Sequence, residues 1–277
     1  MASGGDPVEA ITEAEASGEI AAIYADIRDT FGVRLVNLVW RHLATMPGAL
    51  PWCWAAARPI YKSGRAAAQA QALISELPLP VLPAFSPEAL AAVGVGASDR
   101  ASIQAILDAY NHTNPMALVV LTALRLRLAG DRGTAMPAPP EAKPAPAEAE
   151  LPKLLALAEM PTGTAALVRA LNRIGERGDG RVLASMYRHL AHWPGFLALV
   201  LTQLGVLDGL GYLPRAIDAA LTAAERRGRG LIADLPPASG LPAALRPPVI
   251  AALDEFTRYP IGRMTPIGVL LRRAMPA

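Results

Sequence analysis

The chain has 277 residues, of which 26 are basic and 24 acidic, so its formal charge is only +2. Aromatic residues make up 5% of the sequence, and alanine and leucine far outnumber β-branched residues, which favours helices over a sheet. The balanced charge excludes the extended basic surface by which proteins bind nucleic acid or anionic membranes. The sequence therefore predicts an all-helical protein with neither nucleic acid nor a membrane as its partner.

Cellular location is predicted from three features. The first residues, MASGGDPVEAITEAEA, lack the basic start and apolar run of a secretory signal. Cys53 is the only cysteine, which excludes an internal disulfide and a Cys-x-x-Cys redox pair. The most apolar stretch, FLALVLTQLGVL from Phe196, is interrupted by Gln203 and falls short of the about 20 residues that span a bilayer. We expect a cytoplasmic protein.

In chain order, apolar periodicity predicts first-half helices over residues 15–30, 35–45, 50–76, 87–93 and 99–129. Most Pro and Gly residues lie between such stretches, where they end one helix and start the next.

Residues 130–153 read GDRGTAMPAPPEAKPAPAEAELPK, a composition typical of an exposed connector. We predict a first helical repeat over 1–129, a Pro/Ala-rich linker over 130–153 and a second helical repeat over 154–277, together forming one compact unit.

An internal repeat supports this division. WRHLATMPG from Trp40 matches YRHLAHWPG from Tyr187 at an offset of 187 − 40 = 147, with six of nine residues identical. Near the end of each half, AILDAYNHTNP from Ala105 lines up with AALDEFTRYPI from Ala251 at an offset of 251 − 105 = 146. Blocks in the same order indicate a duplication, so the two halves are predicted to pack as an intramolecular pseudo-dimer.

Both copies of the motif place an Arg-His pair before a Pro-Gly step, as in Arg41-His42 with Pro47-Gly48 and Arg188-His189 with Pro194-Gly195. Because proline cannot continue a helix without losing a backbone hydrogen bond, each motif predicts a short helix and a sharp corner. We favour the interpretation that the Arg and His side chains hold this corner by hydrogen bonds to free carbonyl groups. A catalytic role is the alternative, but a catalytic constellation seldom occurs twice in one chain.

Three segments carry a resemblance to a known family: IYADIRDTFGVRLVNLVWRHLATMPG from Ile23, AYNHTNP from Ala109 and the second motif, RHLAHWPG. Together they resemble the group I (DehI-type) 2-haloacid dehalogenases over nearly the whole chain. The resemblance implies an all-helical pseudo-dimer made from a direct repeat. It also implies hydrolytic displacement of halide from the α-carbon of a short 2-halocarboxylic acid by direct attack of water.

The resemblance implies two catalytic side chains. An asparagine of the first half positions the water, and Asn111, at the head of an NHTNP turn, fits this role, with Asn114 as the alternative. An aspartate that follows a small residue and a serine, near the helix before the second motif, accepts the proton of the water. An apolar pocket raises the pKa of such an aspartate toward neutrality.

This chain departs from that pattern at one position. Ala184 and Ser185 match the small residue and the serine, but Met186 follows, and a thioether cannot accept a proton from water. Asp179 is the nearby carboxylate, although an aspartate between two glycines is also typical of a turn. Both roles of Asp179 stay open.

Asn37 lies in the apolar segment LVNLVW, where an amide without a partner would be costly. We expect Asn37 and its repeat mate Ala184 to face each other across the pseudo-dimer axis, with Asn37 lining a cavity. Ser185 and Asn37 are predicted to bind the substrate carboxylate. The predicted binding set is Asn37, Trp40, Ala184, Ser185, Met186 and Tyr259, of which Trp40 could equally be a core residue.

No metal-binding pattern, phosphate loop or Gly-x-Ser-x-Gly elbow is present, so we expect no metal and no cofactor. One function that fits is hydrolysis of a small 2-substituted carboxylic acid. A non-hydrolytic relative that binds an apolar small molecule is the alternative that Met186 favours. A helical scaffold for a protein partner is the third, and a homodimer is compatible with each.

Overall fold

The computed structural model describes residues 8–136, 149–178 and 182–276, and over these ranges it contains helices and no strand. The predicted all-α class is therefore confirmed. Residues 1–129 contain six helices within the described part: α1 (Gly18–Phe31), α2 (Leu38–Leu43), α3 (Ala49–Lys62), α4 (Arg65–Glu76), α5 (Pro87–Ala92) and α6 (Ala97–Leu128).

The second half follows a similar order. Its α-helices are α7 (Thr162–Arg173), α8 (Ser185–Leu190), α9 (Pro194–Gly209), α10 (Tyr212–Leu231), α11 (Arg246–Phe256) and α12 (Gly262–Ala274). Short 3-10 turns lie at Leu157–Glu159, Ile232–Asp234, Ala238–Gly240 and Ala243–Leu245. A π-helical turn, η5 (Thr257–Ile261), joins α11 to α12, so that these elements together correspond to the single long helix α6.

Two predictions of local structure are wrong. The helix expected over 50–76 is two helices, because Gly64 has a φ of 75° in the left-handed region and breaks the chain between α3 and α4. Gly211, at an offset of 211 − 64 = 147, has a φ of 76° and separates α9 from α10 in the same way. The NHTNP segment is not a turn but the middle of α6, which continues through Pro115.

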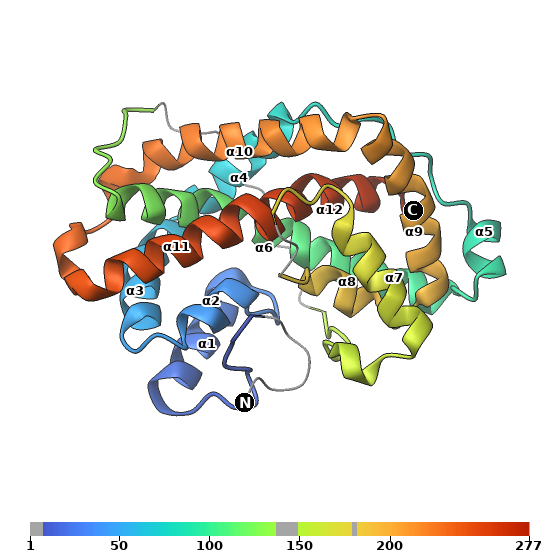
Figure 1. The fold of residues 1–277 in the computed structure, drawn as a ribbon, viewed down its shortest axis with the longest axis horizontal. Helices are drawn as coiled ribbons and strands as arrows, with labels where there is room; N and C mark the ends of the chain where they lie inside the picture. Colours follow the sequence, from blue (N-terminus) through green and yellow to red (C-terminus); the bar gives the residue numbers. More distant parts are fainter. Residues whose placement is uncertain (1–7, 137–148, 179–181, 277) are drawn as a thin grey trace.

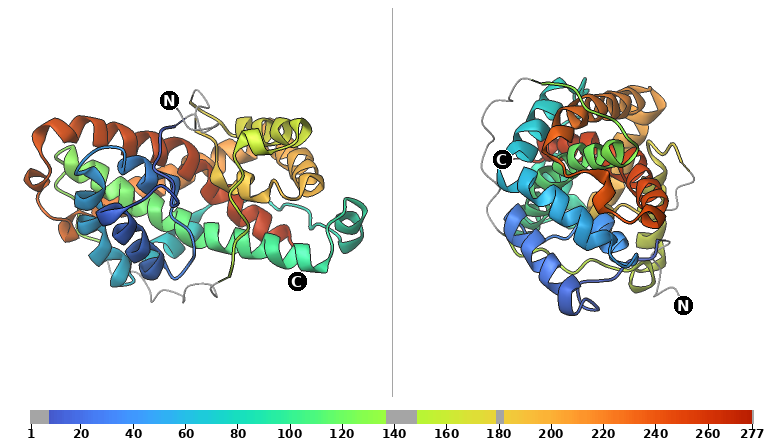
Figure 2. Two further views of the ribbon diagram at one scale, coloured as in Figure 1. Left: turned by 90° about the horizontal axis from the view of Figure 1, so that it is seen from below. Right: turned by 90° about the vertical axis from the view of Figure 1, so that its left-hand side faces the viewer.

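The long helix α6 is the centre of the fold and packs against α4, α10, α11 and α12. Figure 1 shows these helices running side by side, with α1–α3 at one end and α7–α9 at the other. In Figure 2, α6 extends through most of the length of the molecule. Every residue of α6 from 113 to 124 is buried, as expected for a helix that is surrounded by others.

Pairs of contacts recur with the two halves exchanged. Asp108 of α6 pairs with Arg272 of α12 at 2.7 Å, while Asp254 of α11 pairs with Arg125 of α6 at 3.4 Å. The aspartates differ in number by 254 − 108 = 146 and the arginines by 272 − 125 = 147. The additional residue falls in the π-helical turn, because a π-helix holds one more residue in its hydrogen-bonded loop than an α-helix. Such reciprocal contacts are what the predicted duplication requires.

Among the described residues, no single helix is long and apolar enough to cross a membrane. The pair formed by α9 and residues 212–234 meets the length and composition criteria together, but the two parts are bent by 80°.

Candidate functional site

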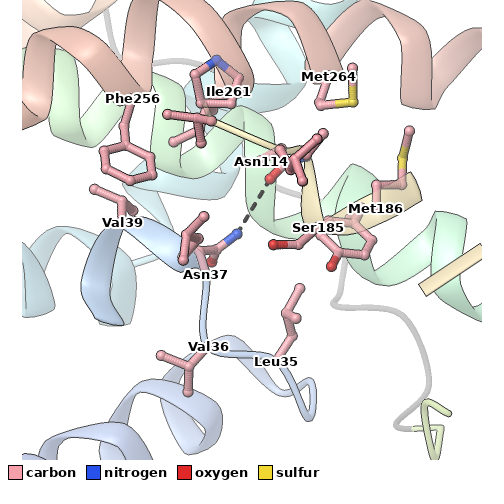
Figure 3. Close-up of a pocket in the computed structure, with 16 residues that line it drawn as sticks. Leu35, Val36, Asn37, Val39, Asn114, Ser185, Met186, Phe256, Ile261 and Met264 are labelled. Atoms are coloured by element: carbon pink, nitrogen blue, oxygen red, sulfur yellow. Dashed lines mark hydrogen bonds between the residues drawn. The ribbon is translucent and has the colours of Figure 1, made fainter. Parts of the chain in front are cut away.

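A small cavity lies where α2, α6, α8 and the α11–α12 junction meet. Figure 3 shows its side chains. The lining residues come from four segments: Leu35, Val36, Asn37, Leu38 and Val39; Tyr110 and Asn114; Val182, Leu183, Ala184, Ser185 and Met186; and Phe256, Pro260, Ile261 and Met264.

The lining is made of repeat-related residues from both halves. Residues 35–39 and 182–186 line opposite walls, and each pair of equivalent positions is 147 residues apart. Tyr110 and Asn114 likewise correspond to Phe256 and Pro260 at an offset of 146. Asn37 and its mate Ala184 therefore both reach the same cavity. A site lined in this way lies where the two halves meet.

Asn37 and Asn114 form the polar wall of the cavity (Figure 3). Asn37 Nδ2 lies 3.3 Å from Asn114 Oδ1 and 3.3 Å from Thr113 Oγ1. The Thr113 hydroxyl donates its proton to Ala109 O at 2.9 Å, so it can only accept from Asn37. This fixes the orientation of the Asn37 amide, whose Oδ1 is buried without a partner among the described residues.

Ser185 and Met186 begin α8 on the other side of the cavity. Ser185 Oγ is buried next to the Tyr110 hydroxyl, whose pKa its proximity lowers, and it has no other partner among the described residues. Met186 is 1% exposed, and it lines the cavity together with Met264 and Ile261 (Figure 3). The thioethers and aliphatic groups make this wall apolar.

Tyr110 connects the cavity to a buried polar cluster. Its hydroxyl lies 2.7 Å from His189 Nδ1. Burial lowers the pKa of His189 to about 3, helped by the positive charges of Arg41 and Arg188, so the imidazole is neutral at pH 7. Burial raises the pKa of the Tyr110 phenol, while the same two guanidinium groups oppose that increase. The two guanidinium groups therefore partly offset the cost of burying a negative charge at this end of the cavity.

A clamp formed by Asn172 and Arg263 holds the wall that precedes Ser185. Asn172 Nδ2 donates to Val182 O at 3.2 Å, and Asn172 Oδ1 accepts from Ala184 N at 3.0 Å. Arg263, 1% exposed, donates to Asn172 Oδ1 at 2.9 Å and to Asn172 O, and pairs with Glu176 at 2.8 Å. These bonds fix residues 182–184 relative to α7 and α12.

The structure brings together four residues of the predicted set, Asn37, Ala184, Ser185 and Met186, at the cavity. Trp40 lies elsewhere, fully buried in a cluster with Trp54 and Tyr61. Tyr259 is not among the lining residues, and its ring contacts Gly178.

Asn111, one of the two predicted catalytic residues, is not among the described residues that line the cavity. Asn111 donates from Nδ2 to Gly268 O at 3.0 Å and is absent from the lining, whereas the alternative, Asn114, lines the cavity. Asp179 lies outside the described residues.

In the Arg-His pairs, the side chains of His42 and Arg188 bind backbone carbonyl groups. His42 Nδ1 lies 2.7 Å from Glu9 O, and Arg188 Nε donates to Leu155 O at 2.7 Å. These carbonyls belong to the segment at the start of each half, rather than to the helix corner that the sequence predicts. His189 differs, because it binds the phenol of Tyr110.

Sequence reasoning missed Tyr110, Phe256 and Met264 of the lining, and the clamp of Asn172 and Arg263. A signal for the first pair was present, because Tyr110 and Phe256 are equivalent aromatic residues in the last repeated block. The clamp had none, since its residues lie 263 − 172 = 91 positions apart and Asn172 has alanine at the equivalent position 25.

Comparison with known proteins agrees with this architecture. The chain is 28% identical over 248 residues to a configuration-inverting 2-haloacid dehalogenase of Alcaligenes xylosoxydans xylosoxydans, covering 83% of this chain and 78% of that protein. A D-2-haloacid dehalogenase in complex with L-LA superposes with a TM-score of 0.71 at 18% identity, covering 96% of both chains. A mutant of a D-2-haloacid dehalogenase with D-2-CPA gives 0.71 at 20% identity and the same coverage. No family model matches the chain.

The fold is thus that of the all-helical haloacid dehalogenases. The chain itself is a divergent homologue of the group I 2-haloacid dehalogenases, which confirms the resemblance seen in its sequence.

Proposed function

We propose that this 2-haloacid dehalogenase-like protein binds a small 2-substituted carboxylic acid in the cavity and displaces the 2-substituent with water. The observation that carries the proposal is the group of three polar side chains, Asn37 and Asn114 on one wall and Ser185 on the other, in a largely apolar cavity between the halves. Small-molecule sites commonly combine apolar walls with a few polar groups in this way.

The polar groups divide the task by their hydrogen-bonding capacity. Asn114 Nδ2 and the Ser185 hydroxyl are donors, and we assign them to the substrate carboxylate. The positive potential of Arg41 and Arg188 at Tyr110 favours a carboxylate at the same end. Asn37 Oδ1 is an acceptor, and we assign it to a proton of the attacking water. Asn114 and Asn37 thereby replace Asn111, whose amide is bound to Gly268.

The reaction proceeds by displacement. The water oxygen forms a bond to the α-carbon while the carbon–halogen bond breaks on the opposite side, and halide leaves with the bonding electrons. One proton of the water passes to a base, and the product is a 2-hydroxy acid. In this hydrolytic version we assign the base to Asp179, because Met186 occupies the position at which the family resemblance places an aspartate.

A second function, binding without hydrolysis, is favoured by a specific observation. None of the described lining residues carries a carboxylate or an imidazole, so within them nothing can accept the proton. In this version the cavity keeps the ligand site of the family and Met186 has removed its chemistry.

Halide release from D- and L-2-chloropropionate separates the two versions. The hydrolytic version predicts release by the purified chain and its loss in Asp179→Asn. The binding version predicts saturable binding without release, and a gain of release in Met186→Asp. Neither binding nor release with either enantiomer would overturn the proposal.

A further inference from the structure

The amide of Asn37 leaves one strong acceptor at the cavity without a partner. Its Nδ2 is used by Thr113 Oγ1 and Asn114 Oδ1, both at 3.3 Å on helix α6. Because the Thr113 proton is donated to Ala109 O, the reverse orientation of the Asn37 amide would place two acceptors together. Asn37 Oδ1 therefore requires a donor, and no described residue supplies one.

The donor that this oxygen needs has to be uncharged. The described lining contains no acidic side chain to balance an ammonium group, and Met186, Met264 and Ile261 make the opposite wall apolar (Figure 3). Burying an ammonium in such a place costs much more than burying a hydroxyl. A halogen on carbon is no donor, so a bound 2-halo acid leaves this acceptor to a separate water molecule, such as the attacking water of the hydrolytic version, whereas a hydroxyl on the acid satisfies it directly.

The neighbouring groups determine what the hydroxyl is attached to. Asn114 Nδ2 is a donor beside Asn37, because Asn114 Oδ1 is the atom that accepts from Asn37. The Ser185 hydroxyl is a second donor, directed toward Asn37 from the other side of the cavity (Figure 3). One acceptor next to two donors matches a hydroxyl on the carbon that carries a carboxylate.

We infer that this cavity prefers a 2-hydroxycarboxylic acid, whose hydroxyl donates to Asn37 Oδ1, over the 2-halo acid of the same carbon skeleton. This inference rests on the proposed function, in which the cavity takes a 2-substituted carboxylic acid. It applies to the binding version directly and to the hydrolytic version in its product complex, where the hydroxyl of the bound acid takes the place of the attacking water at Asn37 Oδ1.

Calorimetric titration of the full chain with three ligands tests the preference: propionate, 2-chloropropionate and lactate, with the D- and L-forms of the last two measured separately. A neutral hydrogen bond to an otherwise unpaired acceptor contributes up to about tenfold in affinity. We expect one enantiomer of lactate to bind about tenfold more tightly than propionate and than either 2-chloropropionate. Halide is assayed in parallel, so that lactate formed during the titration is detected.

A variant removes the acceptor. Asn37→Leu is expected to abolish the preference, with about a tenfold loss for lactate and less than a twofold change for propionate. Asn111→Leu is the matched control, because its amide is bound to Gly268 O outside the cavity, and it should leave all the affinities unchanged. Far-ultraviolet circular dichroism checks that both variants fold. If Asn37→Leu does not fold, the comparison of the ligands on the unaltered chain still tests the preference.

The outcomes separate this inference from the proposed function. Tighter binding of 2-chloropropionate than of both lactates overturns the inference and leaves the proposed function intact. Equal loss of all the ligands in Asn37→Leu overturns it as well, since Asn37 would then support the cavity rather than recognise a hydroxyl. Absence of binding by every acid overturns the proposed function and the inference together.

Discussion

The hydroxyl of Tyr110 lies 2.7 Å from His189 Nδ1, which joins the long helix of the first half to the repeated motif of the second. The equivalent pair with the halves exchanged is Phe256 and His42, whose ring centroids are 5.4 Å apart. The geometry is repeated, but the hydrogen bond is found in one copy. We propose that the duplicated halves have specialised here, with Tyr110 facing the cavity and Phe256 closing its other side.

Replacing Tyr110 by phenylalanine, the residue of its repeat mate, leaves the buried His189 Nδ1 without its partner. We expect the free energy of unfolding to fall by about 1–3 kcal/mol, the usual cost of one buried unpaired polar group. Urea unfolding of Tyr110→Phe measures this loss. In the double variant Tyr110→Phe/His189→Leu, the substitution of His189 should lower the free energy of unfolding by less than it does in the single variant. Strictly additive losses of unfolding free energy would contradict the contact between the two side chains.

The depressed pKa of His189 predicts a pH dependence of stability. Its pKa is about 3 in the folded chain and near 6.5 in an unfolded one, so the unfolded chain binds the proton more readily between these values. Stability contributed by neutral His189 is therefore complete above pH 6.5 and decreases as the pH falls toward 3, by up to about 1.4 kcal/mol per pH unit.

Urea unfolding between pH 7.5 and pH 5 measures that slope. The His189→Gln variant, which keeps a polar group beside Tyr110, should be less stable at pH 7.5 but lose less stability on acidification. A slope equal to that of the unaltered chain would show that His189 is not the group responsible.

The clamp of Asn172 and Arg263 predicts a loss of function in addition to a loss of stability. Asn172→Ala removes the bonds to Val182 O and Ala184 N, and we expect about 2–4 kcal/mol of destabilisation from these and from the contact with Arg263. Because residues 182–184 line the cavity, ligand affinity should fall at least tenfold in calorimetric titration.

Gln69→Ala is the control for this prediction. Gln69 is 1% exposed and accepts from buried Arg227 at 2.8 Å, but neither residue lines the cavity. The Gln69→Ala variant should therefore be less stable than the unaltered chain but bind the ligand with unchanged affinity. An equal loss of affinity in both variants would mean that destabilisation alone is responsible. Asn172→Asp keeps the acceptor for Ala184 N and should recover part of the affinity.

The position of the Asn111 amide can be tested at Gly268. A Cβ added there would overlap Asn111 Oδ1 and lie 3.7 Å from the Met186 sulfur. Gly268→Ala should therefore destabilise by about 1–3 kcal/mol, although alanine within an open helix face would stabilise by about 1 kcal/mol. Thermal unfolding of Gly268→Ala and Gly268→Ala/Asn111→Ala measures the coupling, and a stabilised Gly268→Ala would place Asn111 elsewhere.

The composition of the sequence predicts the all-helical class, and the repeat predicts which segments line the cavity. Asn37 and Ala184 were expected to face one cavity, and equivalent residues of the two motifs do line it. The same alignment pairs Gly64 with Gly211, and both have a positive φ. The predicted helix over 50–76 ran through Gly64 because that prediction used apolar periodicity alone.

The choice between Asn111 and Asn114 could not be made from the sequence. The two residues lie three positions apart on one helix, so their side chains point about 60° apart, and only packing decides which one reaches the cavity. The clamp could not be predicted from the sequence for a related reason: Arg263 contacts Asn172 only in the folded chain, and neither residue belongs to a local sequence pattern.

The central claim is that the cavity between the repeated segments is a ligand site for small 2-substituted carboxylic acids. A crystal structure of the chain soaked with lactate, at a concentration that calorimetry shows to be saturating, tests it most directly. We expect density for the acid in this cavity, with its carboxylate near Asn114 and Ser185 and its hydroxyl within hydrogen-bond distance of Asn37 Oδ1. An empty cavity with the acid bound elsewhere would contradict it.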